Sequence, residues 1–266
     1  MALSLNFSKE PLNQILTAGN SSVKLVILNR PPKLNSLNHE MISLILKNLK
    51  VYESDSSVKL VILKGNGKGF CAGGDVVSVV SSSLTGHWTY PVKFYEKQLI
   101  LDHLTATYKK PLVSLINGMV MGGGAGLSMN STFRIVTEKA ENEIENGGEE
   151  KWITNALSSM HSSSPISLKI FLKSIRKGRI QNIEQCLYRD YKIASHILRR
   201  TLSNDFYEGS RAKLFDKDNK PKWKPSKLEL VSEEMVNQHF RNMNDDEWEP
   251  LQLPQRSDSP IIPCRL

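Results

Sequence analysis

The 266-residue sequence contains little cysteine, and nothing about its three cysteines indicates a disulfide framework. Cys71, Cys186 and Cys264 are odd in number and far apart, which fits a reducing compartment. Long hydrophobic runs are also absent, so we expect no membrane-spanning helix and no membrane partner. The first residues lack a basic segment and a following apolar stretch, and we expect neither a secretory signal nor a transit peptide.

Several signatures of cofactor sites are missing as well. The histidines form no HExxH pattern and no paired Cys/His spacing, so we expect no metal site. No Gly-Lys-Ser/Thr phosphate loop occurs, and Gly67-x-Gly69 lacks the clean following helix of a dinucleotide fingerprint. The segment after Gly126 lacks the final glycine of a nucleophile elbow. The sequence therefore predicts no separate cofactor.

The net charge of +8 raises the question of an anionic partner. Lysines and arginines are spread along the chain with acidic residues between them, and they are densest from Lys169 to Arg211. Such interleaving is typical of a solvated helical surface rather than of a stripe that binds nucleic acid. We therefore expect no nucleic acid partner, while part of the charge is available for a phosphorylated small molecule.

Apolar segments bounded by turn residues predict four strands. The expected strands are residues 23–29, 58–64, 111–116 and 133–136. Helices are expected after Asn38, which has the character of an N-cap, and over about residues 92–107. Strands that alternate with helices in this way predict an α/β fold.

The composition changes after Glu138 and suggests how the chain is divided. Residues 140–151 are rich in glutamate, and we interpret them as an acidic junction. This junction would separate an N-terminal core, residues 1–139, from a helical C-terminal region, residues 152–253. Residues 254–266 are expected to form a flexible tail.

Two glycine-containing loops give the strongest indication of function. Ala72-Gly73-Gly74-Asp75 comes after the second strand, and Gly122-Gly123-Gly124 comes after the third. An acyl thioester is hard to attack because negative charge builds up on its carbonyl oxygen, and two backbone N–H groups aimed at that oxygen stabilise the charge. Small residues let the backbone come close to the ligand. Two tight turns would explain either loop alone, whereas the pair favours an oxyanion hole.

Further motifs extend this pattern over nearly the whole chain. They are Asn29-Arg30-Pro31, Asn35-Ser36-Leu37, Phe70-Cys71-Ala72-Gly73-Gly74-Asp75 and Asn117-Gly118-Met119-Val120-Met121-Gly122-Gly123-Gly124. Together they resemble the enoyl-CoA hydratase/isomerase (crotonase) superfamily, which implies a crotonase-like ββα spiral core. In the C-terminal half, the segments 164–169, 205–209 and 216–225 resemble 3-hydroxyisobutyryl-CoA hydrolases, in a form similar to plant members.

The resemblance implies roles for the loop residues. Gly74 and Gly123 would supply the two N–H groups of the oxyanion hole, and Asp75 would orient its loop or cap a helix. The register places Gln98, with Glu96 close by, where the family has a glutamate that contacts the substrate. The other substrate-binding positions would be Ala72, Gly73, Asp75, Gly122 and Gly124. Coenzyme A would be part of the acyl-CoA substrate. The sequence leaves open whether the chain forms a homo-oligomer.

Two residues argue against other chemistries. Gly126 fills the position where enoyl-CoA hydratases place a catalytic glutamate, which disfavours hydratase chemistry. Cys71 has no base that can be read from the sequence, so we expect a small buried side chain rather than a nucleophile.

The main departure from the family lies after Lys139. The resemblance implies that a Met-Pro-Glu segment and a Phe-Pro-Asp-Val-Gly segment follow there and supply the catalytic glutamate and aspartate. Neither segment occurs, and Ala140 leads directly into an acidic stretch that resembles a region nearer the family's C-terminus. We expect this loss to truncate the core and to remove the general acid/base. We also expect it to expose apolar faces of the first three strands unless another element covers them. Glu141, Glu143 and Glu145 are more readily explained as a solvated linker than as substitutes.

Two hypotheses from different classes follow. The first is a hydrolase of 3-hydroxyisobutyryl-CoA in valine breakdown, impaired by loss of the glutamate/aspartate segment. The second is a catalytically inactive protein that binds acyl-CoA or a partner through the same fold. The final tripeptide, Cys264-Arg265-Leu266, resembles a peroxisomal address and favours the peroxisome, with the mitochondrion or cytosol as alternatives.

Overall fold

The computed structural model describes residues 13–137 and 149–256. These residues form two compact units, and each unit is assembled from two stretches of the chain. The first comprises Met1–Asp75 and Leu104–Gly147, and the second comprises Val76–His103 and Gly148–Leu266. Residues 76–103 therefore belong with the C-terminal half, whereas the sequence analysis placed them in a continuous N-terminal core. The physical reason is packing, because the helix at 76–85 contacts the one at 205–210.

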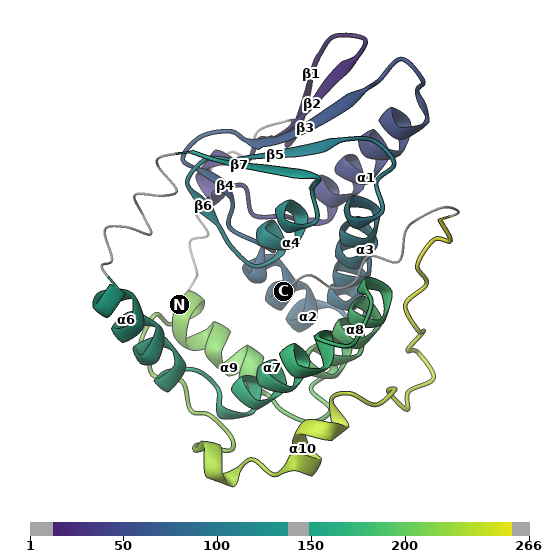
Figure 1. Ribbon diagram of the computed structural model, residues 1–266. Coiled ribbons are helices and arrows are strands. Elements are labelled where there is room, and N and C mark those ends of the chain that lie inside the picture. Colours follow the sequence, from purple (N-terminus) through teal and green to yellow (C-terminus); the bar gives the residue numbers. More distant parts are fainter. Residues whose placement is uncertain (1–12, 138–148, 257–266) are drawn as a thin grey trace. The chain divides into compact units, whose positions relative to one another are not determined.

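The first unit contains a five-stranded sheet (Figure 1). In spatial order its strands are β1 (Ile15–Gly19), β2 (Val23–Leu28), β3 (Leu60–Gly65), β5 (Leu112–Ile116) and β7 (Phe133–Val136). β1 is antiparallel to β2, and all other neighbours are parallel. The α/β class and four of the strands are confirmed. β1 was not predicted from the sequence, because its Thr-Ala-Gly end has little apolar alternation.

Helix α1 (His39–Ser54) crosses over from β2 to β3 and supplies much of this unit's core. The Asn38 side chain accepts a hydrogen bond from the Met41 N–H at 2.9 Å, which confirms the expected N-cap. Apolar residues at helical spacing are fully buried on one face, namely Met41, Ile42, Ile45 and Leu49. A short 3-10 helix, Pro31–Lys33, lies between β2 and α1.

The second unit is helical in the part of the chain that the structure describes. Its elements are α2 (Val76–Thr85), α3 (Thr89–Ala106, whose last turn belongs to the first unit), α6 (Glu149–His161), α7 (Pro165–Gly178), α8 (Ile183–Arg199), α9 (Asp205–Ser210), a π-helical turn (Arg211–Phe215), a 3-10 turn (Leu228–Leu230) and α10 (Glu233–Gln238). Ser164 caps α7, and Asn182 forms a capping box with Gln185 at the start of α8. These caps divide the helical stretch expected from residue 152 onward.

Exposure in the sheet is concentrated at one edge. Every residue of β7 is exposed, and the exposed fractions of Phe133, Ile135 and Val136 are 58%, 53% and 43%. The residues of β3 and β5, in contrast, alternate between buried and half-buried. Neighbouring elements therefore cover the first three expected strands, and the exposed apolar surface lies on the fourth expected strand. No helix of the described residues is long and apolar enough to span a membrane.

Candidate functional site

The two glycine loops are brought together by a small second sheet in the first unit. β4 (Gly69–Cys71) pairs in parallel with β6 (Met119–Val120), and α4 (Gly123–Met129) follows β6. Because parallel strands end at the same edge, the loop after Cys71 and the loop after Val120 lie side by side. The Met121 N–H donates to the Cys71 carbonyl at 3.0 Å and fixes this arrangement.

Glycine is required where the two loops meet. Gly73 has a φ of +95°, and a Cβ atom there would lie 3.0 Å from the Met121 carbonyl oxygen and 3.4 Å from the Gly123 nitrogen. At Gly124, a Cβ atom would lie 2.4 Å from the Cys71 carbonyl oxygen. Any side chain at either position would therefore push the loops apart.

Two N–H groups at this junction are not used by the fold. The neighbouring amides already donate hydrogen bonds to backbone carbonyls: Ala72 to Leu34 at 2.9 Å, Asp75 to Leu37 at 2.8 Å and Gly124 to Met121 at 2.8 Å. Within the described residues, the amides of Gly74 and Gly123 have no such acceptor. A Cβ atom at Gly73, the residue before Gly74, would lie only 3.4 Å from the Gly123 nitrogen, so the two donors belong to loops that touch one another. Such a pair can stabilise negative charge on one ligand oxygen.

A buried ion pair holds the first loop in place. The Arg30 guanidinium donates to the Asp75 carboxylate at 2.9 Å, and the two side chains are only 3% and 10% exposed. The same guanidinium donates to the Ser36 carbonyl at 2.7 Å. Asp75 thus anchors the loop that carries Gly74.

Asn35 is a second anchor, and the sequence analysis gave it no role. Its side-chain oxygen accepts from the Arg30 N–H at 2.8 Å, and its side-chain nitrogen donates to the carbonyls of Asn66 and Gly69 at 2.9 and 2.8 Å. The residue itself has a φ of +56°, a conformation that asparagine tolerates. The Asn-Ser-Leu motif was a sign of this role, but motif letters alone do not reveal which backbone groups a side chain satisfies.

Cys71 is completely buried in β4, and its sulfur lies 3.2 Å from the Asn35 carbonyl oxygen. This environment fits the expected small buried side chain. In the part of the chain that the structure describes, no group of three or more His, Cys, Asp or Glu side chains is arranged to hold a metal ion.

Gln98 lies in the second unit, on α3, and is 5% exposed. Its side-chain nitrogen donates to the Asp102 carboxyl at 3.1 Å. Burial raises the pKa of Asp102 to about 7, the hydrogen bond from Gln98 opposes this rise, and the charge of Asp190 adds to it. A substrate contact by Gln98 stays a prediction.

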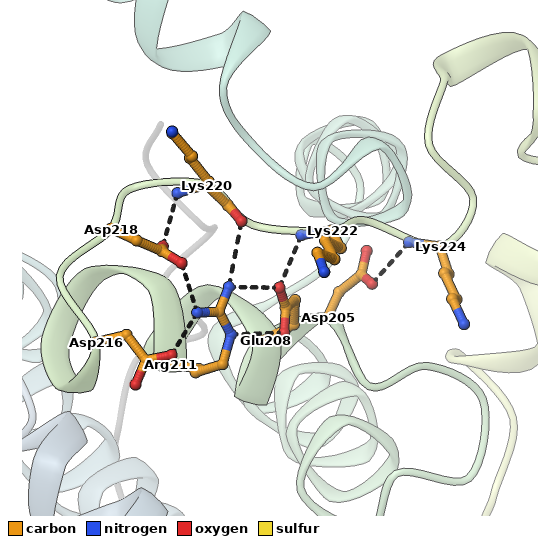
Figure 2. Close-up of polar contacts among 8 residues, drawn as sticks. All are labelled: Asp205, Glu208, Arg211, Asp216, Asp218, Lys220, Lys222 and Lys224. Atoms are coloured by element: carbon orange, nitrogen blue, oxygen red, sulfur yellow. Dashed lines mark hydrogen bonds and ion pairs between the residues drawn. The ribbon is translucent and has the colours of Figure 1, made fainter.

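Arg211 binds the segment 216–225, one of the segments that carry the family resemblance (Figure 2). This arginine was not predicted to have a role from the sequence. Its guanidinium binds the carboxylates of Glu208, Asp216 and Asp218 at 2.9, 2.6 and 2.8 Å. The hydrogen bonds from Arg211 and from the Lys222 N–H lower the pKa of Glu208 to about 2. Trp223, in the same segment, donates from its indole N–H to the Ser162 carbonyl at 3.2 Å.

Comparison with known sequences identifies the class of protein. A family profile described as enoyl-CoA hydratase/isomerase matches the chain in two segments, residues 23–143 and 140–240. The chain belongs to this family. In fold, it is similar to an enoyl-CoA hydratase from Rhodobacter sphaeroides, with a TM-score of 0.76 and 20% identity, over 86% of this chain and 98% of that one.

Individual relatives narrow the comparison. The chain is 31% identical to a probable 3-hydroxyisobutyryl-CoA hydrolase 3 of Arabidopsis thaliana, over 92% of this chain and 96% of the relative. It is 30% identical to 3-hydroxyisobutyryl-CoA hydrolase 1 of the same plant, over 94% and 97%. A Gallus gallus relative, 26% identical over 84% and 87%, is named a mitochondrial 3-hydroxyisobutyryl-CoA hydrolase. The tripeptide 264–266 lies outside the described residues, and the peroxisome stays a prediction.

The same alignments reveal a large gap in this chain. The first of them runs over 364 positions, whereas 92% of 266 residues is about 245. More than 100 positions of that relative therefore have no counterpart here. The two segments matched by the family profile meet at residues 140–143, where the sequence analysis placed the missing block. Glu141, Glu143 and Glu145 lie outside the described residues.

Proposed function

We propose that the chain binds acyl-CoA thioesters at the amides of Gly74 and Gly123. We further propose that it hydrolyses 3-hydroxyisobutyryl-CoA to 3-hydroxyisobutyrate and coenzyme A, as in valine breakdown, at a strongly reduced rate. The observation that carries this proposal is the pair of unused N–H groups in touching loops. The names of the relatives support the substrate.

The chemistry assigned to these residues is charge stabilisation. When water attacks the thioester carbon, the carbonyl oxygen becomes negative, and the two amides would bind it more tightly than they bind the neutral carbonyl. The intermediate then expels the coenzyme A thiolate, which takes up a proton from solvent, and the acid is released. Asp75, the carboxylate of the Gly74 loop, is engaged by Arg30 and is not available to activate the water. We therefore expect the slow step to be the attack of water.

Thiol release from 3-hydroxyisobutyryl-CoA by the purified chain tests the proposal. Gly123 is the first residue of α4, a position that tolerates proline, so Gly123→Pro removes the N–H with little change to the helix. We expect the unaltered chain to be slow but at least about 10-fold faster than Gly123→Pro, because one oxyanion donor is typically worth more than that. Gly126→Ala, in the same helix, keeps both amides and serves as the matched control. Equal rates for the unaltered chain and Gly123→Pro would refute hydrolysis at this site.

A catalytically inactive acyl-CoA-binding protein is the second candidate, and the missing block of more than 100 positions favours it. Calorimetry with a non-hydrolysable thioether analogue of the substrate separates the two. Binding without turnover supports this second candidate. Absence of both binding and turnover would contradict both.

A further inference from the structure

The open edge of the first unit's sheet is the structural basis for a further inference. β7 lies at the end of the strand order and, among residues 13–137 and 149–256, has a hydrogen-bonded neighbour, β5, on one side only. The side chains of β7 are exposed, and so is that of Met129 nearby. The exposed fractions of the apolar side chains among them lie between 43% and 60%. An exposed apolar edge strand is a template for pairing, and natural proteins usually protect such edges with lysine, proline or a bulge. β7 contains no lysine, proline or bulge, and its one charged side chain, Arg134, is turned back onto the backbone of residues 129 and 131.

The direction of the free backbone groups follows from one hydrogen bond. The Thr137 N–H donates to the Ile116 carbonyl of β5 at 3.0 Å. In an extended strand the backbone groups of alternate residues point to opposite sides, so those of Ile135 also face β5. The N–H and C=O groups of Arg134 and Val136 therefore point to the open edge.

The strand is self-complementary in one antiparallel register. A two-fold axis through Ile135 places Arg134 opposite Val136 of a second copy, and each such pair exchanges two backbone hydrogen bonds. The two arginines do not face one another in this register. The Arg134 guanidinium is in any case turned back to the carbonyls of Met129 and Ser131, at 2.8 and 2.9 Å. Ile135 would meet Ile135 of the second copy at the axis.

We infer that a second copy of this chain pairs with β7, so that two five-stranded sheets join into one across a two-fold axis at Ile135. The contact comprises four backbone hydrogen bonds and a small apolar patch, which is well below a standard interface of about 1,600 Å². The dimer is therefore weak, with a dissociation constant on the order of 0.1 mM. The net charge of +8 on each copy opposes association, so added salt strengthens it.

Sedimentation velocity on the full chain tests this pairing directly. We expect monomer at about 2 μM and a substantial dimer fraction at about 200 μM, as follows from a dissociation constant between these values. Ile135→Lys abolishes the dimer, because two like charges then meet at the axis. Val51→Lys is the matched control, since Val51 is 55% exposed on α1 of the same unit, and it leaves the dimer unchanged. A chain that stays monomeric, or a dimer that survives Ile135→Lys, overturns the inference.

Mixing two variants tests the symmetry itself. Ile135→Lys and Ile135→Glu are each monomeric alone, but in a 1:1 mixture opposite charges meet at the axis and the dimer returns. In addition, Ile135→Cys in a Cys264→Ser background oxidises to a linked dimer, because the paired Cα atoms are about 4.5 Å apart in this kind of pair. Phe133→Cys in the same background, which does not face itself, links far more slowly. A mixture no more associated than its components, or equal linking at both positions, refutes the two-fold axis at Ile135.

Discussion

At the scale of single residues, the Arg30–Asp75 pair in the first unit's site joins two side chains that are almost completely buried. Asp75→Ala leaves a buried guanidinium without its carboxylate, and we expect the free energy of unfolding in urea to fall by about 3–5 kcal/mol. The double variant Arg30→Met/Asp75→Leu removes both charges and should recover part of this loss.

A surface pair provides the contrast for this prediction. Glu234 and Arg241 are 54% and 63% exposed in their ion pair, so Glu234→Gln should change stability by no more than about 1 kcal/mol. A loss for Asp75→Ala as small as that for Glu234→Gln would show that the buried pair does not hold the loop.

Asp102 makes stability depend on pH. Its pKa is raised by burial from 3.8 to about 7 in the folded chain, so the folded state binds more protons than the unfolded state between these values. Stability from this group is therefore present below about pH 4 and is lost as the pH rises through about 7, by up to a few kcal/mol in total. Asp102→Asn keeps an acceptor for Gln98 and removes the titration.

The measurement is the urea unfolding free energy of both proteins at pH 5 and pH 8. We expect the advantage of Asp102→Asn over the unaltered chain to be larger at pH 8. An advantage that is the same at both values would show that Asp102 does not titrate in this range.

Residue types at the site were readable from the sequence, but their partners were not. Paired glycine loops at strand ends are typical of backbone donors for a ligand, and the family resemblance then implied Gly74 and Gly123 as the donors and Asp75 as a structural residue. Arg30 and Asn35 satisfy groups up to 45 positions away in the chain, and no local pattern encodes such contacts. Arg211 was missed because an arginine among many charged neighbours is not distinctive.

At the scale of elements, the packing of Trp223 against α9 holds the segment 216–225 within the second unit. A Cβ atom at Gly209 would lie 2.8 Å from the Trp223 ring, so Gly209→Ala must displace the ring. We expect a loss of about 1–3 kcal/mol in unfolding free energy and faster tryptic cleavage after Lys222.

Gly178→Ala is the control for this prediction, because the nearest atom to a Cβ there is 3.8 Å away. It should leave both the stability and the cleavage pattern nearly unchanged. If Gly209→Ala behaves in the same way, Trp223 does not hold the segment.

Elements with strong periodicity or a clear cap were predicted from the sequence, and weakly patterned ones were not. α1 was placed by Asn38 and by its apolar spacing, and β7 was placed at its observed ends. α2 was missed, because its Val-Val-Ser-Val-Val start has the β-branched composition of a strand and only tertiary packing makes it helical.

At the scale of the whole molecule, the missing block is the difference from the relatives that bears most directly on activity. Insertion of the corresponding segment of the Arabidopsis hydrolase between Lys139 and Glu141 should raise the rate of 3-hydroxyisobutyryl-CoA hydrolysis by at least about 100-fold, because acid/base groups commonly contribute that much. Thiol release under identical conditions measures this change.

The same insertion into the Gly123→Pro variant should give a much smaller gain, since the oxyanion donor is then lost. Equal gains in both backgrounds would mean that the inserted segment acts without the Gly74–Gly123 pair.

The interleaving of the two units has a consequence for synthesis of the chain on the ribosome. The strands of the first unit are complete once residue 136 has emerged, but α2 and α3 must wait for α8 to α10 before the second unit can close. At translation rates of about 5–20 residues per second, this delay is on the order of ten seconds. During that time residues 76–103 form a loop of the finished first unit and lack the C-terminal helices of their own unit. This segment is the part of the nascent chain that most needs a chaperone.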